Sequence, residues 1–372
     1  MESFKLNISS SLGNPTDPKT WSATPYNICK VLEEKGKLGL VVDSRFASKY
    51  VKAPLKLLSM LQYQRSQDMA RGNVYRYYRS YLLKKKLETA SSIHTLHMGT
   101  YDLPFLTLDK RQKHYLYVDT TWNLWSQFSS EMSNYSEKLI KDAESLEKKA
   151  YSQLTHIFSI SHYVKQNLME HYGVSENKIS VVGTGRGIIQ PYFGKKDYHN
   201  GKILFVAKGR FEDKGGFLVL DAFKLALKQN PELSLTIVGQ HDYSSKIKQE
   251  NVTTLGFIKL EQLQQLFIDH SLFVMPAINE PWGLVYLEAL SCKMPIIGLN
   301  KNSFPEISQN GKYGSVIDSP DPLSLAEIMV NSFKYPDILN EKGEQGQDFC
   351  LKTFTWNEVV EKIVKTIEEQ YL

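Results

Sequence analysis

The chain has 372 residues, of which 42% are hydrophobic and 23% are charged, and its formal net charge is +5. This length predicts two domains, since single cores stop growing at roughly 250–300 residues, and the composition is that of a soluble globular protein. Three scattered cysteines without a CxxC pair argue against a disulfide framework or a structural zinc site. No apolar run approaches roughly 18 residues and no secretory signal is visible, so we expect a cytoplasmic protein.

The first half of the chain alternates segments typical of strands and helices. The strand expected at Phe4–Ile8 runs into a long polar loop that contains Gly13, Trp21 and Ser22. Ligands of doubly wound α/β sheets bind beyond the carboxyl ends of the strands, so this loop is expected to line a crevice. Further strands of this half are predicted at 38–43, 92–99, 114–119, 156–161 and 179–182.

Two histidines, His94 and His97, lie on the strand predicted at 92–99. Their odd spacing places them on opposite faces of the strand, so they cannot jointly hold a metal ion. His97 stands near the end of the strand, where a side chain can meet a ligand; a core or capping histidine is the alternative. Asp119 ends the next strand and is a second polar candidate.

Positive charge is concentrated between Arg45 and Ala90, where eleven Lys and Arg residues face two acids, a local net charge of +9. Two helices are predicted there, at 53–64 and 74–87, and the second is rich in tyrosine. Basic residues interleaved with aromatics bind nucleic acid or an anionic membrane surface in some proteins, and form a solvated face in others. No nucleic-acid motif is present, so we expect no nucleic acid partner.

The sequence GTGRG at 183–187 is only superficially like a dinucleotide-binding fingerprint. The position of the third glycine is occupied by Ile188, and Pro191 follows where a helix should open. We therefore interpret it as a turn at the exit of a strand. It leads into a linker at 187–201.

A second series of strands and helices begins with the strand Lys202–Ala207. The loop after it, KGRFEDKGG, places Arg210 and Lys214 between glycines before a helix. A planar guanidinium and a flexible ammonium suit a diphosphate that gains charge as its substituent leaves. The same half has a buried strand at 233–239, and Ile258 follows a further strand at 252–256.

The most informative stretch is Ser271–Cys292, in which an apolar strand passes through a short loop to a helix. Glu280 closes the loop, and the helix then opens at Pro-Trp-Gly. The helix start near Gly283 and Leu284 offers unpaired backbone N–H groups and a partial positive charge, which favour a phosphate. Glu288 lies two turns into the helix on a burying face, where a carboxylate needs donors such as the hydroxyls of a ribose.

This stretch resembles the signature of the family 4 retaining glycosyltransferases of GT-B fold, a glutamate followed eight positions later by a second glutamate. Glu280, Gly283, Glu288, Ala289 and Pro295 match the pattern in place. The resemblance implies two doubly wound, Rossmann-like α/β domains facing a cleft. The expected division is an acceptor-side domain at 1–186, the linker at 187–201, a nucleotide-sugar-binding domain at 202–350, and a terminal helix at 351–372 that crosses back to the first domain.

The resemblance also implies a function, the retaining transfer of a sugar from a nucleotide diphosphate sugar to an acceptor hydroxyl. UDP is favoured over GDP, and the acceptor is a sugar, a lipid-linked glycan or a small molecule of cell-envelope, polysaccharide or glycoconjugate synthesis. The absence of a DxD motif agrees with metal-free catalysis, so we expect no cofactor. Docking of the basic region 45–90 would make the protein peripheral at the inner face of the membrane.

The roles carried over from the family fall into three groups. Catalysis is assigned to Glu280, Lys214, Arg210 and His97. Donor binding is assigned to Glu288, Gly283, Leu284, Ile258 and Gly13, with Ile258 at the base pocket. The acceptor-side candidates are Asp119, Trp21 and Ser22.

Three alternatives remain open from the sequence. A nucleotide-sugar epimerase shares this fold, and a catalytically silent nucleotide-sugar-binding subunit would keep the same donor contacts. A glycosidase also uses two carboxylates, about 5–9.5 Å apart, but has no need of the Arg210 and Lys214 loop.

Overall fold

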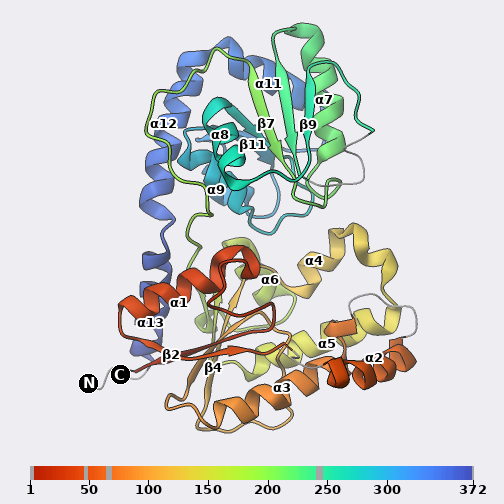
Figure 1. Cartoon of the computed structure of the whole chain (residues 1–372), viewed down its shortest axis with the longest axis vertical. Coiled ribbons are helices and arrows are strands. Elements are labelled where there is room, and N and C mark those ends of the chain that lie inside the picture. Colours follow the sequence, from red (N-terminus) through yellow and green to blue (C-terminus); the bar gives the residue numbers. More distant parts are fainter. Residues whose placement is uncertain (1–3, 46–48, 64–68, 240–245, 371–372) are drawn as a thin grey trace. The chain divides into compact units, whose positions relative to one another are not determined.

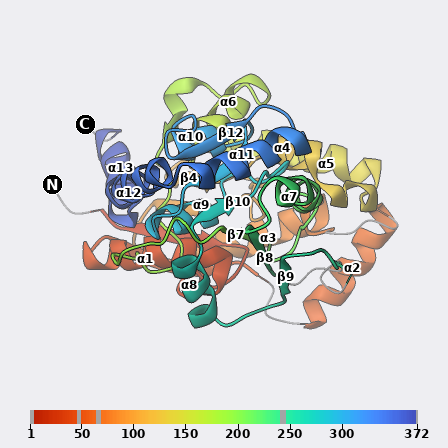
Figure 2. The ribbon, with the colours of Figure 1, turned by 90° about the horizontal axis from the view of Figure 1, so that it is seen from above.

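The computed structural model describes residues 4–45, 49–63, 69–239 and 246–370. The chain forms two compact units, Met1–Gly185 together with Trp356–Leu372, and Arg186–Thr355 (Figure 1). Each unit is built on a six-stranded parallel sheet with helices packed around it (Figures 1 and 2). The prediction of two doubly wound α/β domains is therefore confirmed.

The sheet of the first unit has the order β2-β1-β3-β4-β5-β6. Its inner strands β1 and β3 are buried along their whole length, as expected for parallel strands covered on both faces. The strands are β1 Leu6–Ser10, β2 Leu38–Asp43, β3 His94–Met98, β4 Lys113–Val118, β5 His156–Ser159 and β6 Ile179–Val181. The helices are α1 Thr24–Glu34, α2 Lys49–Tyr63, α3 Asn73–Leu87, α4 Trp122–Phe128, α5 Glu137–Gln153, α6 His162–Glu170 and α13 Trp356–Glu369.

The last helix, α13, belongs to the first unit although it ends the chain. Its buried residues follow the helical period and include Val360, Ile363 and Ile367, so one face packs against the unit. The opposite edge carries ion pairs to the end of α1, with Lys35 Nζ 2.8 Å from Glu361 Oε1. The returning helix begins at Trp356, five residues after the start of the predicted segment.

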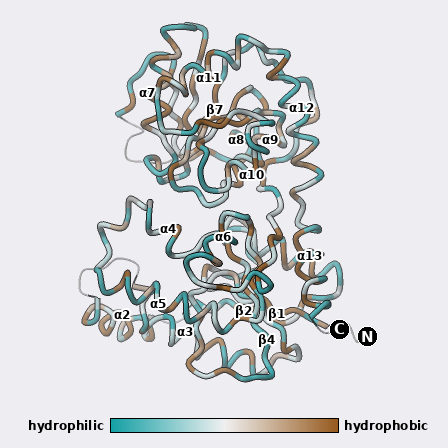
Figure 3. Tube along the Cα trace, turned by 180° about the vertical axis from the view of Figure 1, so that it is seen from behind, coloured by the Kyte–Doolittle hydropathy of each residue, from teal (hydrophilic) through white to brown (hydrophobic). Residues whose placement is uncertain are grey.

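The sheet of the second unit has the order β12-β11-β10-β7-β8-β9. Figure 3 shows a concentration of hydrophobic residues along β7, which is one of the two central strands of the sheet although it comes first in the chain. The strands are β7 Lys202–Val206, β8 Ser234–Val238, β9 Val252–Leu255, β10 Leu272–Val274, β11 Ile296–Leu299 and β12 Gly314–Ile317. The helices are α7 Gly216–Gln229, α8 Leu260–Asp269, α9 Leu284–Ser291, α10 Phe304–Ser308, α11 Pro322–Lys334 and α12 Pro336–Thr353.

The strand order of the second unit reverses direction between β7 and β10. The chain first adds β8 and β9 on one side of β7, and then returns to add β10, β11 and β12 on the other side. In such sheets the ligand binds at this switch point, beyond the carboxyl ends of the two central strands. The loops after β7 and β10 are therefore the parts of the unit that the topology brings together.

The segment 187–201, expected as a linker, is an integral part of the second unit. The Tyr192 N–H donates to the Ser291 carbonyl at 3.1 Å, and Tyr198 Oη donates to the Lys293 carbonyl at 2.8 Å. Lys196 Nζ donates to three carbonyls at the end of α8, those of Phe267, Ile268 and His270. Residues 187–201 form no helix or strand, but their polar groups make hydrogen bonds to helices that lie far along the chain.

Candidate active site

The loop after β7 and the loop after β10 are joined by backbone contacts at the switch point. The Asp213 carbonyl accepts hydrogen bonds from the N–H groups of Ile278 and Asn279, at 2.8 and 3.1 Å. Gly215 has φ +79°, and a Cβ there would lie 2.2 Å from the Pro276 carbonyl oxygen. The glycine thus allows the close approach of the two loops, which holds their charged side chains in one place.

Lys214 and Glu280, one from each loop, form an ion pair. Lys214 Nζ lies 3.4 Å from Glu280 Oε2, and the side chains are 15% and 16% exposed. The prediction named both residues, but only the strand order explains why positions 66 residues apart meet. An ammonium that is held near the surface by a carboxylate remains available to a bound anion.

Arg210 belongs to the same site but is more strongly engaged by the protein. Its backbone is left-handed, with φ +55°. The guanidinium donates from Nε to Asp213 Oδ2 at 3.0 Å and from Nη2 to the Asn279 carbonyl. A third of the side chain is still exposed. Asp213 and Asn279 therefore hold the arginine in place. Neither was predicted from the sequence, although Asp213, which directly precedes Lys214 in the sequence EDK, could have been recognised as a partner for a nearby cation.

The start of α9 has the geometry that the sequence predicted for Gly283 and Leu284. Gly283 is the N-cap with φ +84°, and a Cβ there would lie 2.7 Å from the Tyr286 ring. The Tyr286 hydroxyl in turn donates to the Met275 carbonyl, which anchors the first turn of the helix to the end of β10. The Tyr286 N–H donates to the Gly283 carbonyl at 2.9 Å, and the two N–H groups before it, at Leu284 and Val285, come ahead of this first hydrogen bond, so an anion can bind them.

Glu288 is the fifth residue of α9, just over one turn from its start, and is half-buried. Burial raises its pKa to about 7, although the backbone N–H groups of Ile188 and Ile189 and the charge of Lys214 act in the opposite direction. The Ile188 N–H donates to Glu288 Oε1 at 2.9 Å. A Cβ on Gly187 would lie 2.0 Å from the same oxygen, so this carboxylate requires a glycine beside it.

Ile258 lies in the loop between β9 and α8, at the carboxyl edge of the same sheet. It is half-buried, while its neighbour Phe257 is 75% exposed. Gly239, at the end of β8, donates its N–H to the carbonyls of Leu255 and Gly256, which ties this loop to the neighbouring strand.

The loop after β1 holds Gly13, Trp21 and Ser22 in the first unit. A Cβ on Gly13 would lie 2.4 Å from Thr20 Oγ1, so packing within the loop already requires a small residue there. Trp21, Ser22 and Ala23 all have positive φ, at 41, 54 and 63°. Three consecutive left-handed residues without a glycine are costly, and such backbone is concentrated at functional sites.

His97 lies in the core of the first unit, which supports the core alternative and argues against contact with a ligand. Its side chain is fully buried, with Nδ1 3.3 Å from Asp102 Oδ1 and Nε2 3.1 Å from His114 Nδ1. The hydroxyl of Ser9 also donates to Asp102, at 2.6 Å. Asp119 follows β4 and is half-buried, one residue beyond the sheet.

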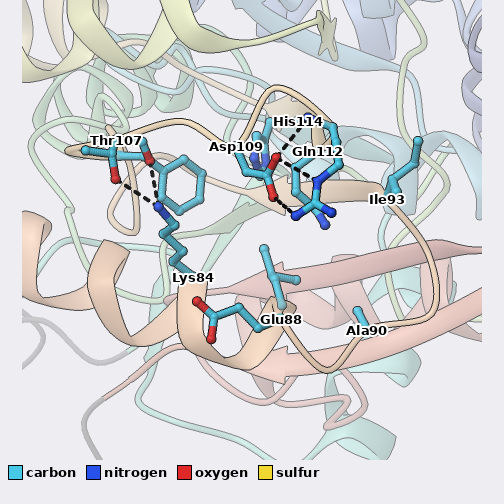
Figure 4. Close-up of a pocket in the computed structure, with 11 residues that line it drawn as sticks. Lys84, Glu88, Ala90, Ile93, Thr107, Asp109, Gln112 and His114 are labelled. Carbon is cyan, nitrogen blue, oxygen red and sulfur yellow. Dashed lines mark hydrogen bonds and ion pairs between the residues drawn. The ribbon is translucent and has the colours of Figure 1, made fainter.

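The first unit also contains a pocket of about 470 Å³ that the sequence analysis did not predict. It lies between the end of α3 and the loop that precedes β4 (Figure 4). Lys84 and Glu88 project from the helix side, and Asp109 and Gln112 come from the loop. These positions are far apart in the sequence and carry no known motif.

In residues 4–45, 49–63, 69–239 and 246–370, no group of three or more His, Cys, Asp and Glu side chains has the geometry of a metal site. None of the helices in those ranges is both long and apolar enough to cross a lipid bilayer.

Comparison with protein families gives a match over most of the second unit and the returning helix. Residues 190–368 match the family described as glycosyl transferases group 1. A 41.2 kDa protein in the cps region of Klebsiella pneumoniae is 26% identical over 243 residues, which are 61% of this chain and 67% of that protein. Mannosylfructose-phosphate synthase of Agrobacterium fabrum is 22% identical over 54% of this chain and 50% of its own length.

Solved structures show the same fold over nearly the whole chain. Sucrose-phosphate synthase from Thermosynechococcus elongatus superposes with a TM-score of 0.71 at 13% identity, and 99% of each chain is covered. HepE from Anabaena, solved with UDP, superposes with a TM-score of 0.66 at 14% identity and covers 98% of this chain and all of its own. At this level of identity the likeness shows the GT-B fold alone.

Proposed function

Because this chain belongs to the family of glycosyl transferases group 1, we propose that it transfers a sugar from a nucleotide diphosphate sugar to an acceptor hydroxyl with retention of the anomeric configuration. The donor is a UDP-sugar in preference to a GDP-sugar, and no metal ion takes part. The observation that carries the proposal is the ion pair of Lys214 and Glu280 beside the first turn of α9. A cation, a carboxylate and free backbone N–H groups are there within reach of one ligand.

The diphosphate is the leaving group, and the site stabilises the charge that it acquires. The N–H groups at Leu284, together with Lys214 and Arg210, bind the phosphate oxygens. When the bond from the anomeric carbon to the phosphate oxygen breaks, its electron pair stays on the phosphate. The acceptor oxygen forms its new bond on the same face of the sugar, and its proton passes to the departing phosphate.

Two carboxylates orient the donor. Glu280 accepts hydrogen bonds from hydroxyls of the transferred sugar, and Glu288 accepts those of the ribose. One oxygen of Glu288 accepts from the Ile188 N–H, so the ribose binds chiefly at the other oxygen. Lys214 exchanges its bond with Glu280 for one with the diphosphate, and the base lies against the loop that holds Ile258.

The acceptor is a hydroxyl of a glycan, a glycolipid or another glycoconjugate of the cell envelope. The related protein of the Klebsiella cps region supports a role in polysaccharide synthesis, and the UDP in the HepE structure supports a uridine donor. In the first unit, Trp21, Ser22 and Asp119 are the residues we assign to the acceptor. The backbone strain at Trp21 and Ser22 is the feature that favours them.

The test combines a donor screen with product analysis. UDP- and GDP-sugars are ranked by the increase in melting temperature that they cause, and the best donor is incubated with acceptor glycans. Proton NMR of the product then reports the anomeric configuration. We expect an α-linked product from an α-linked donor, formed equally well in the presence of EDTA. An inverted product or a dependence on added metal would contradict the mechanism.

The same assay separates the alternatives. An epimerase would convert the donor without any acceptor, and a glycosidase would release sugar from a glycoside that lacks phosphate. A non-catalytic subunit would bind the donor in calorimetry without transfer or slow hydrolysis. Lys214→Met abolishes donor stabilisation in a transferase, but leaves the cleavage of a simple glycoside unaffected.

We also propose peripheral contact with an anionic membrane through the basic region 45–90. The outer face of α2 is apolar although it faces solvent, with Leu57 61% and Leu61 75% exposed. Lys52 and Lys56 flank this face and are also exposed. Apolar side chains bordered by lysines suit a helix that lies in the plane of a bilayer surface. This arrangement supports a location at the inner face of the membrane.

Liposome sedimentation tests this contact. We expect binding to vesicles that contain an anionic lipid, loss of binding in Leu57→Gln/Leu61→Gln, and retention in Leu260→Gln, an exposed leucine of the second unit. Equal binding of the double variant, or no binding of the native protein at low salt, would exclude α2 as a membrane contact.

A further inference from the structure

The pocket of the first unit is at the end of the sheet opposite to the loops with Trp21 and Asp119. Gln112 precedes β4 and Ile93 precedes β3, so both lie at the amino ends of parallel strands. Its volume of about 470 Å³ is within the range of small-molecule sites. The pocket is built entirely from residues of one unit, and its ligand chemistry can be derived without reference to the donor site.

The charged side chains around the pocket balance one another. Lys84 donates to the Thr107 hydroxyl at 2.8 Å, and Arg111 pairs with Asp109 at 2.9 Å (Figure 4). Glu88 adds a second carboxylate beside these two cations. Two positive and two negative groups give no net charge, so the pocket has no preference for an ionic ligand.

The floor of the pocket carries an imidazole whose hydrogen-bonding role is set by the core. Asp102 accepts the proton on His97 Nδ1, which leaves His97 Nε2 as an acceptor when both rings are neutral. His114 must then place its own proton on Nδ1 to donate to His97 at 3.1 Å. Burial and the neighbouring His97 lower the pKa of His114 to about 3, so this ring stays neutral. Its remaining nitrogen, Nε2, is an acceptor.

A second acceptor lies beside this imidazole. Gln112 Oε1 is buried and has no hydrogen-bond partner among the described residues. An unmet acceptor of this kind costs free energy, and a donor brought by a ligand would recover it. The Gln112 side chain as a whole is half-buried and lines the pocket. The aromatic ring of Phe105, which also lines the pocket, packs against His114 with 4.6 Å between the ring centroids.

We propose that this pocket is a second carbohydrate-binding site, which takes one neutral sugar residue by its hydroxyl groups. A sugar carries no charge, its hydroxyls donate to Gln112 Oε1 and His114 Nε2, and they accept from Lys84. The site gives the protein a hold on a glycan that is independent of the nucleotide-sugar site of the second unit.

Saturation-transfer NMR on the full-length protein tests the proposal. Glucose, galactose, N-acetylglucosamine and their disaccharides are presented at pH 8 with excess UDP, which occupies the proposed donor site. We expect saturation transfer to at least one neutral sugar, and affinity about tenfold weaker in Gln112→Leu. This near-isosteric change removes an unpartnered acceptor, so the melting temperature is expected to stay unchanged or rise.

The matched control is Lys110→Met, an exposed residue of the same loop that does not line the pocket. It should bind the sugars as the native protein does. Absence of transfer to every neutral sugar, equal binding by Gln112→Leu, or binding of charged sugars alone would overturn the proposal. Since no turnover is measured, failure of the proposed glycosyltransfer would leave this result unaffected.

Discussion

The ion pair of Lys214 and Glu280 allows the stability and the chemistry of the site to be separated by substitution. Coulomb's law at an effective dielectric constant of about 20 gives an attraction of about 5 kcal/mol for unit charges 3.4 Å apart. Desolvation and ordering of the two side chains offset most of this attraction. Because both side chains retain some exposure, we expect Lys214→Met to lower the free energy of unfolding by about 1–2 kcal/mol.

The expected loss of turnover is larger than the loss of stability. Removing one group that stabilises the charge of a leaving group costs about 10²–10³-fold in kcat. The double variant Lys214→Met/Glu280→Gln leaves no unpaired charge and should regain the stability, but not the turnover. Lys224→Met, an exposed position on α7, serves as the control for surface charge.

Two measurements check these expectations. Urea unfolding followed by circular dichroism gives the free energies, and release of the nucleoside diphosphate from the best donor gives kcat. The reasoning is refuted if Lys214→Met keeps more than about a third of the native turnover. It is also refuted if the double variant recovers activity together with stability, because the pair would then be a structural contact only.

Three further predictions concern residues around the site and the core. Glu288 has a pKa raised to about 7 in the folded protein, so between its unfolded value and pH 7 the folded state binds more protons than the unfolded state. The free energy of unfolding should therefore fall as the pH rises through this window, by at most about 3 kcal/mol. Glu288→Gln should flatten this dependence, as followed by the melting temperature at a series of pH values. Gly187→Ala places a methyl group 2.0 Å from Glu288 Oε1, so calorimetry should show weaker binding of the nucleoside diphosphate, while Gly36→Ala, whose Cβ meets no atom within 4 Å, should not change it. His97→Phe leaves Asp102 without one of its partners in the core, so it should lower the free energy of unfolding in urea by about 3–5 kcal/mol. The affinity for the nucleoside diphosphate should not change. A changed affinity with unchanged stability would show that His97 belongs to the ligand site.

The helices and strands of this protein could largely be predicted because local patterns are strong in parallel α/β sheets. Buried parallel strands such as β7 are apolar on both faces, and the helices between them follow the period of 3.6 residues. The site loops were also recognisable, because cations, glycines and carboxylates follow apolar strands at the expected positions. Lys214, Glu280, Gly283 and Glu288 were all identified in this way.

The sequence could not decide which of these polar residues meet. Arg210 was expected to face a diphosphate, and only the tertiary structure shows that Asp213 and Asn279 hold its guanidinium in place. His97 has the position of a ligand-binding residue at a strand end, yet its register on β3 points it into the core toward Asp102. A strand pattern gives the alternation of faces, but not which face the helices cover.

The two α/β domains and the chemistry of the loops at 208–216 and 276–283 can be predicted from local patterns, because both depend on periodicity and on residue type. Tertiary packing makes these loops neighbours, brings the Ile188 N–H to Glu288 with Gly187 beside the carboxylate, and forms the pocket at Gln112 and His114 in the first unit. These contacts depend on the order of strands in the sheets, and that order is set by packing between segments that are remote in the chain.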